Sequence, residues 1–265
     1  MRFRTALHSA PLLAAALLYA GPLSAQSISL EVSPNPIPPG SSALITGTDA
    51  TGGGLALPSG CGWLSIHQGS PTGPEIGFPG GCGAAIIDVA ANGSFGYTWF
   101  GLDENGVPLP DGEYWLESFV YSPDFSTVHT DWFCVSVQAP DQPTLSTSGA
   151  PQVGQALALD LSAPAFAGTP YIAGASFSSN APIAIPGLGQ LCLSADNLFW
   201  ASYPAPVAGV FQNFQGALDA SGQASLSLQL PGFPPLAYQA LQLQAVLIAP
   251  TGFVKTNALT LSIRP

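Results

Sequence analysis

The chain has 265 residues, of which 47% are hydrophobic and only 7% are charged, and its formal net charge is −11. This apolar content is ample for a packed core, and the length suits one large domain or two ordinary ones. The acidic balance repels phosphate backbones, which argues against nucleic acid as a partner and disfavours anionic membrane surfaces.

Residues 1–25 have the three parts of a secretory signal peptide. Arg2 and Arg4 give a positive start, Leu12 to Ala20 form a short apolar core, and a small residue precedes Gln26 at the cleavage point. This apolar core is too short to span a bilayer as a helix, and the absence of a cysteine after the cleavage point disfavours a lipid anchor. We therefore expect a secreted or extracytoplasmic protein without membrane insertion, in the periplasm, at the cell surface or in the medium.

Beyond the signal peptide, short β-rich runs bounded by Gly, Pro, Asn or Asp replace helical periodicity. Before residue 139 these runs are Ser27–Val32, Ala43–Thr48, Trp63–His67, Ala84–Val89, Ser94–Phe100, Glu113–Tyr121 and Trp132–Gln138. After residue 143 they are Thr144–Ser148, Ala156–Ser162, Ile172–Ser178, Leu191–Ala195, Ala224–Leu230, Ala240–Ile248 and Ala258–Ile263. Short strands with turn signals between them are typical of an immunoglobulin-like sandwich.

The two sets of strands share a layout. We therefore predict an all-β chain of two tandem immunoglobulin-like β-sandwich domains at 26–138 and 144–265, joined by a proline-containing linker at 139–143. The offset between matching features grows from about 114 residues at the start to about 127 at the end, which indicates insertions after a duplication. General β-sandwich patterning without duplication is the alternative explanation.

The two predicted domains differ in charge. Residues 26–138 hold 11 carboxylates and no Lys or Arg, whereas residues 144–265 hold three carboxylates and two basic residues. If one domain contacts cations or a cationic surface, we expect it to be the first.

Four motifs of the first predicted domain stand out: Val32-Ser33-Pro34, Pro39-Gly40, Gly93-Ser94-Phe95 and the run from Leu109 to Tyr114. Through them the domain resembles bacterial immunoglobulin-like modules of surface and secreted proteins. In the second predicted domain the corresponding stretches are Gly149–Gly154, Pro186–Leu193, Leu228–Pro231, Gln244–Val246 and Thr256–Leu259. They make it similar to an uncharacterised β-rich domain found at the C-termini of secreted bacterial proteins. Both resemblances imply secretion and a β-sandwich, and neither implies an activity.

Four cysteines in an exported chain predict disulfides. A bond between Cys61 and Cys82 would close a Gly-rich loop within one domain. Cys134 and Cys192 would then lie in different domains, either bridged across the interface or free. A zinc site that combines cysteines with histidines matches no familiar finger spacing, and an oxidising compartment disfavours thiolate ligands.

Histidines are too few and too scattered to predict hydrolysis. Only His67 and His129 follow the signal peptide, and no Gly-x-Ser-x-Gly motif supplies a nucleophile. We therefore predict a protein that is not an enzyme, with a secreted hydrolase based on paired carboxylates or a distant Ser-His-Asp set as the minor alternative.

Oxygen ligands gather in one loop of the first predicted domain. The candidate calcium ligands are Asp103, Glu104, Asn105, Asp111 and Glu113. Asp, Asn and Gly are also the ordinary residues of solvated hairpin turns, which is the competing interpretation.

Aromatic residues give the most suggestive pattern. Alternation along the run from Glu113 to Tyr121 places Tyr114, Leu116 and Val120 on a core face. The opposite face carries Glu113, Trp115, Glu117, Phe119 and Tyr121. This second face is suited to stacking on a sugar or contacting a protein, unless the second domain or a loop covers it.

The leading prediction is therefore a non-enzymatic secreted or cell-surface structural, adhesion or interaction protein. The first alternative is a carbohydrate-binding module that uses the aromatic face. The expected partners are a glycan or an envelope protein, and calcium is the one cofactor considered.

Overall fold

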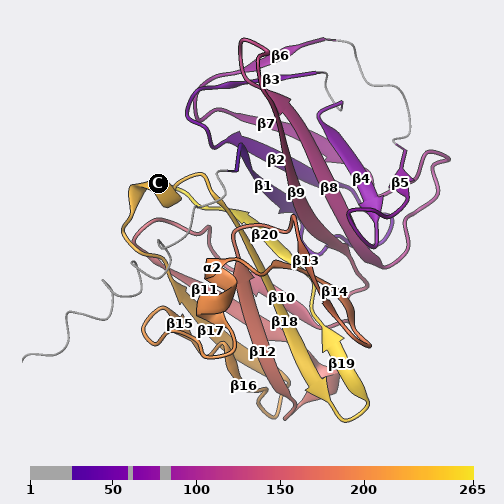
Figure 1. Cartoon of the computed structure of the whole chain (residues 1–265). Helices are drawn as coiled ribbons and strands as arrows, with labels where there is room; N and C mark the ends of the chain where they lie inside the picture. The colour runs from indigo at the N-terminus through magenta and orange to yellow at the C-terminus, as the bar shows by residue number, and fades with distance from the viewer. Residues whose placement is uncertain (1–25, 59–61, 78–84) are drawn as a thin grey trace, which may run out of the picture.

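The computed structural model describes residues 26–58, 62–77 and 85–265, and its regular structure is almost wholly β (Figure 1). The prediction of an all-β fold is confirmed. Within the described residues the exceptions are α2 (Asn197–Ser202) and the single 3-10 turns η1 (Pro164–Phe166) and η2 (Pro234–Leu236). None of the helices in this part of the chain is long and apolar enough to cross a membrane.

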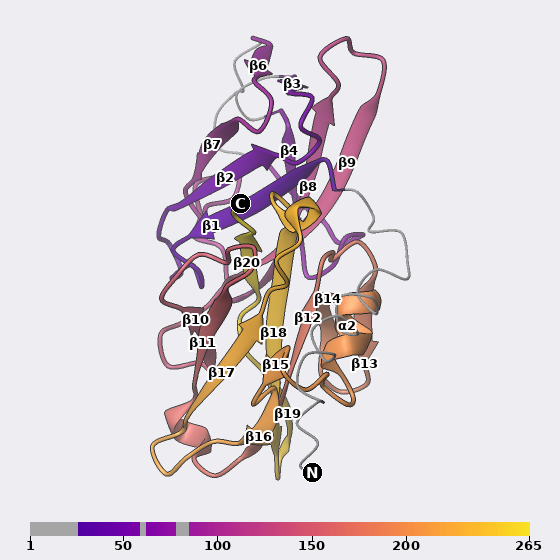
Figure 2. The ribbon, with the colours of Figure 1, turned by 90° about the vertical axis from the view of Figure 1, so that its left-hand side faces the viewer.

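The strands form two units (Figures 1 and 2). Each unit encloses a hydrophobic core. The N-terminal unit holds β1 (Ile28–Ser33), β2 (Ala43–Asp49), β3 (Leu55–Leu57), β4 (Leu64–Gln68), β5 (Glu75–Ile76), β6 (Ile87–Val89), β7 (Ser94–Trp99), β8 (Gly112–Tyr121) and β9 (Val128–Val137). The C-terminal unit holds β10 (Thr144–Thr147), β11 (Ala156–Ser162), β12 (Pro170–Ser176), β13 (Pro182–Ile185), β14 (Gly189–Ser194), β15 (Phe211–Gln212), β16 (Gln215–Ala217), β17 (Gln223–Gln229), β18 (Ala240–Ala249), β19 (Gly252–Lys255) and β20 (Leu259–Ser262).

Two sheets make up the N-terminal unit. One has the order β1-β2-β7, and the other has the order β5-β4-β8-β3-β6 with β9 paired to β8. The longest ladder joins β8 to β9 antiparallel, from Gly112 opposite Val137 to Tyr121 opposite Val128. Fully buried aromatic side chains, among them Trp99 and Tyr114, fill the core of this unit.

The C-terminal unit has a similar pair of sheets. One runs β10-β11-β17-β15, and the other runs β16-β12-β18-β19 with β20 also paired to β18. The hairpin β13-β14 is separate from both sheets. In β11 the sequence alternation is followed closely, because Leu157, Leu159 and Leu161 are buried while Ala156 and Ala158 are exposed. Burial of each leucine contributes about 1.5–3 kcal/mol, so this alternation fixes which face of the strand meets the core.

A parallel bridge in each unit joins the segment after the first strand to the end of the unit, within β9 in one case and just after β20 in the other. In the N-terminal unit Ile37 bridges to Val137, and in the C-terminal unit Gln152 bridges to Arg264. Ile37 N donates to Ser136 O at 2.9 Å, as Val153 N donates to the Arg264 carbonyl at 2.9 Å. Both units therefore close the sandwich edge in the same way.

The hydroxyl group of Tyr114 donates a hydrogen bond to the carbonyl oxygen of Pro110, 2.8 Å away, just before β8 begins. Burial, together with the charge of Asp111, raises the pKa of Tyr114 to about 12. The phenol therefore remains a donor at ordinary pH and holds the turn that leads into β8.

The segment between β12 and β15 departs from the sequence prediction. We expected almost no helix, but α2 begins after Asp196, whose Oδ1 accepts from Phe199 N at 2.9 Å and caps the first turn. The other carboxylate oxygen accepts from Phe177 N at 2.6 Å, which ties the helix to the end of β12. Burial raises the pKa of Asp196 despite these hydrogen bonds. A six-residue helix is too short for periodicity to reveal, and only its cap marks it in the sequence.

Candidate functional site at the junction of the units

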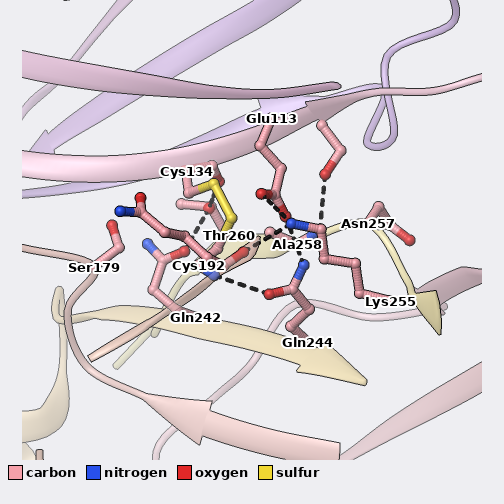
Figure 3. Close-up of a disulfide and its surroundings, with 12 residues drawn as sticks. Glu113, Cys134, Ser179, Cys192, Gln242, Gln244, Lys255, Asn257, Ala258 and Thr260 are labelled. Atoms are coloured by element: carbon pink, nitrogen blue, oxygen red, sulfur yellow. Dashed lines mark hydrogen bonds and ion pairs between the residues drawn. A yellow bond between two sulfur atoms is a disulfide. The ribbon is translucent and has the colours of Figure 1, made fainter. Parts of the chain in front are cut away.

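A disulfide between Cys134 in β9 and Cys192 in β14 joins the two units (Figure 3). Both cysteines are fully buried, their Cα atoms are 5.5 Å apart, and 58 residues separate them along the chain. The sequence left open whether these two cysteines pair, and the structure pairs them. Cys61 and Cys82, the other predicted pair, lie outside the described residues.

An ion pair and a glutamine continue the junction beside the disulfide (Figure 3). Lys255 Nζ lies 2.5 Å from Glu113 Oε2, and their side chains are 25% and 9% exposed. Gln244 Nε2 donates to Glu113 Oε1 at 2.9 Å, while Gln244 Oε1 accepts from Cys192 N at 2.9 Å. Hydrogen bonds thus satisfy the carboxylate and the amide, as polar groups buried at an interface require.

The first strand and the residues just before it contribute a second set of contacts between the units. Gln26 is buried, its Nε2 donates to Phe177 O, and its Oε1 accepts from Ala240 N at 2.7 Å. Further along the chain, the hydroxyl oxygens of Ser29 and Ser262 are 2.6 Å apart. The junction therefore extends well beyond the disulfide.

The charges of the two units are complementary at the junction. Lys255 and Arg264 are the only basic residues that follow residue 25, and both belong to the C-terminal unit. Lys255 pairs with Glu113, and Arg264 Nη2 lies 3.6 Å from Glu31 Oε2. Both partners belong to the N-terminal unit, which has no Lys or Arg of its own after residue 25. Attraction between the units is therefore built into their compositions.

Two residues of the predicted aromatic face are enclosed at this junction. Trp115 is fully buried and packs with both cysteines of the disulfide and with Ala258. Glu113 is held by Lys255. Alternation correctly placed both residues on the face of β8 opposite its core, but the C-terminal unit covers that part of the face. Trp115 consequently offers no surface on which a sugar could stack.

The rest of the predicted face stays partly open. Glu117, Phe119 and Tyr121 are half-buried along β8. His67 Nε2 lies 3.6 Å from Glu117 Oε2, and the His67 ring lies 5.2 Å from the ring of Trp132. Burial raises the pKa of Glu117, which the nearby His67 partly opposes. The sequence analysis placed His67 and Trp132 in predicted strands but missed them as members of this face. Which strands lie next to each other in a sheet cannot be read from a single sequence.

A serine lies beside His67, which bears on the hydrolase alternative. Ser65 Oγ is 3.1 Å from His67 Nε2 and donates to Glu75 Oε1 at 2.9 Å. The serine hydroxyl therefore points its proton at Glu75 in this arrangement, and not at His67. The other ring nitrogen faces the carbonyl of Gly73 at 3.2 Å. Ser65, His67 and Glu75 thus form one hydrogen-bonded network.

The candidate calcium ligands Asp103, Asp111 and Glu113 each contact different partners. Asp103 Oδ1 accepts from Asn105 N and Val107 N at 2.9 and 2.8 Å, and the Val107 bond is the largest cause of its lowered pKa. Asp111 Oδ2 accepts from Ala139 N at 3.4 Å, and Glu113 pairs with Lys255. Within the described residues, the structure shows no such contact for Glu104.

Among the described residues, the one group of three acidic, histidine or cysteine side chains close enough for a shared ion is Glu113 with Cys134 and Cys192. The two sulfurs of that group are bonded to each other and cannot ligate as thiolates.

A polar groove of about 400 Å³ opens beside the ion pair. Asp111, Glu113, Gln138 and Lys255 are among the residues that line it. The groove contains residues of both units and of the segment that connects them, so its shape depends on how the units are docked.

Comparisons with known proteins name no relative. No family model matches the chain, and no curated protein matches it. Among solved structures, a transglutaminase of red sea bream is similar over 91% of this chain and 32% of its own, with a TM-score of 0.29 and 11% identity. A Salmonella alpha-2-macroglobulin mutant is similar over 91% of this chain and 15% of its own, with a TM-score of 0.24 and 16% identity. The chain thus spans about a third or less of either protein, and both scores are too low to support a shared fold or activity.

Proposed function

We propose that this chain is a non-enzymatic structural or interaction protein of the cell exterior, in which two immunoglobulin-like sandwiches are held in one fixed orientation. The observation that carries the proposal is the disulfide between Cys134 and Cys192, because it joins two units that each have their own core. A buried disulfide between units restrains their relative movement, which a spacer or adhesion module requires. It is also compatible with an oxidising, extracytoplasmic location.

The strand orders support the immunoglobulin-like interpretation. In such folds the first, second and fifth strands form one sheet and the third, sixth and seventh form the other. The sheets β1-β2-β7 and β4-β8-β9 correspond to that plan, as do β10-β11-β17 and β12-β18-β20. The hydrogen bond from Tyr114 to Pro110 resembles the tyrosine corner of immunoglobulin-like domains.

The parallel bridges support a duplication. Ile37 and Gln152 are 115 residues apart, and Val137 and Arg264 are 127 residues apart. These separations agree with the offsets expected from the sequence layout. The proposed domains meet at residues 139–143, where Gln138 Nε2 donates to Pro143 O at 2.8 Å and braces a short turn.

Small-angle X-ray scattering tests the fixed orientation. The oxidised protein should give the scattering profile of one rigid, two-lobed particle, the same at low and moderate ionic strength. The matched comparison is the double variant Cys134→Ala with Cys192→Ala, whose profile should show a broader distribution of overall dimensions. A distribution just as broad for the oxidised parent protein would contradict the proposal.

A carbohydrate-binding role is the second candidate, favoured by the half-buried Glu117, Phe119 and Tyr121 next to His67 and Trp132. Aromatic rings beside a carboxylate can stack on a sugar and accept its hydroxyl protons. The test is a glycan array with and without calcium, using the parent protein and Trp132→Ala. Binding that Trp132→Ala abolishes while a distant substitution, Phe100→Ala, leaves it intact would establish this role. Binding unaffected by Trp132→Ala would refute it.

A further inference from the structure

An apolar cavity of about 380 Å³ lies on the outer side of the C-terminal unit. Its floor is the sheet of β12, β18 and β19, and its cover consists of α2 and the β13-β14 hairpin, which lie together beside β12 in Figure 2. Ile183, Leu191, Phe199, Tyr203 and Val246 are among the lining side chains. The volume falls within the range of small-molecule sites, roughly 300–1,000 Å³.

The chemistry of the lining restricts what the cavity can hold. None of the described side chains in the lining is ionisable at neutral pH, and the amide of Gln244 is already bonded to Glu113 and Cys192. Trp200 Nε1 donates to the Ala195 carbonyl at 3.1 Å. Within the described residues, the hydroxyl of Tyr203 is the one polar side-chain group of the lining without a hydrogen-bond partner. A sugar or a peptide would bury polar groups there without partners, which is costly.

The mouth of the cavity is unusually apolar. Trp200, Ile248 and Phe253 are large hydrophobic residues that line it and are exposed. Large side chains left in water next to a cavity mark a binding surface more often than a solvated one. An occupant that filled the cavity and reached the mouth would cover all three.

The cover belongs to neither sheet of the C-terminal unit. The elements β13, β14 and α2 lie between β12 and β15 in sequence, and β13 and β14 pair only with each other. The cover packs buried side chains against the sheet, among them Leu193 and Phe199, so it is held in place. Beside this cluster it leaves the cavity open, whereas a protein interior has few voids.

From these observations we infer that the cavity binds a single aliphatic chain with an uncharged hydroxyl or ester head group. The chain fills the apolar space, and the head group accepts or donates a hydrogen bond at the Tyr203 hydroxyl. A carboxylate head group is disfavoured because the formal net charge is −11, and Lys255 and Arg264 are already paired with Glu113 and Glu31. This inference concerns a site that the proposed function does not use.

Titration of the protein that begins at Gln26 with straight-chain alkanols from 1-hexanol to 1-dodecanol tests the inference. Trp200 is the only tryptophan of the C-terminal unit and lines the cavity, so the part of the fluorescence change that is lost in the Trp200→Phe variant reports occupancy. Saturable binding should tighten about fourfold per added methylene until the cavity is full. Binding that does not saturate, or that does not depend on chain length, would overturn the inference.

Variants separate the cavity from nonspecific apolar binding. Val246→Trp fills the space and should abolish 1-decanol binding, measured by calorimetry. If that variant does not fold, Phe253→Ala at the mouth takes its place and should weaken binding about tenfold. Phe125→Ala is the matched control, because Phe125 and Phe253 are both 48% exposed. Equal affinity in the Phe253→Ala and Phe125→Ala variants would refute the assignment, and decanoate binding as tight as that of 1-decanol would refute the uncharged head group.

Discussion

Removing the disulfide between the units should cost about 4 kcal/mol of stability. The change is the double substitution Cys134→Ala with Cys192→Ala, which leaves no unpaired thiol. The bond closes a loop of 58 residues, and the loss of chain entropy on closing such a loop in the unfolded state corresponds to about 4 kcal/mol. The buried position of both cysteines makes alanine the fitting replacement, since it adds no polar group to the core.

Urea unfolding followed by two probes measures this effect. Four of the five tryptophans lie in the N-terminal unit, so fluorescence reports mainly on that unit while far-ultraviolet circular dichroism reports on both. The parent protein should show coincident transitions, and the variant should show a lower midpoint and separate transitions for the two probes. Cys61→Ala with Cys82→Ala is the matched control, because the sequence places that pair within one unit. A loss below about 1 kcal/mol with transitions that still coincide would show that the disulfide does not hold the units together.

Four further substitutions probe single contacts. Lys255→Met leaves the nearly buried carboxylate of Glu113 without a cationic partner and should cost about 1–3 kcal/mol in urea unfolding. Arg264→Ala removes an exposed ion pair and should cost less than about 1 kcal/mol. Equal losses of stability in the two variants would contradict this ranking. Burial raises the pKa of Asp131 above its unfolded value. The stability that the neutral carboxyl group contributes is therefore fully present below about pH 4 and is lost as pH rises through the folded pKa. Asp131→Asn should therefore gain stability relative to the parent protein between pH 3 and pH 7, and a constant difference between the two proteins would refute the assignment. Tyr114→Phe removes the bond to the Pro110 carbonyl and should cost about 1 kcal/mol, without change in the circular dichroism spectrum of the folded protein.

The fold was largely predictable because each strand records its two faces in its own sequence. In the strand β11 the leucines at 157, 159 and 161 alternate with small or polar residues, and the structure buries the leucines. The same reasoning located β8, where Tyr114, Leu116 and Val120 are buried as expected. Short elements escaped prediction: β15 (Phe211–Gln212) has too few residues to show a period.

The candidate site was predictable only in part because its contacts cross long stretches of chain. Lys255 is 142 residues from Glu113, and no local pattern in either segment points to the other. Alternation showed that Trp115 lies on the outer face of β8, but what covers that face depends on how the units dock. The pairing of Cys134 with Cys192 is a consequence of the same docking, so the sequence could offer it only as one of several arrangements.

The uneven distribution of charge between the two units bears both on how they dock and on the charge of the surface that stays exposed on the N-terminal unit. Both basic residues that follow residue 25 lie at the junction, where they pair with Glu31 and Glu113. The remaining nine of the 11 carboxylates at 26–138 have no Lys or Arg in their own unit to neutralise them. Several of these carboxylates accept hydrogen bonds from backbone N–H groups instead. Asp49 is a buried example: hydrogen bonds from Thr51, Asn92 and Gly54 outweigh the effect of burial and lower its pKa. Once the junction forms, the exposed surface of the N-terminal unit is anionic. Its attraction for partners therefore favours cationic surfaces over anionic ones and weakens as salt is added.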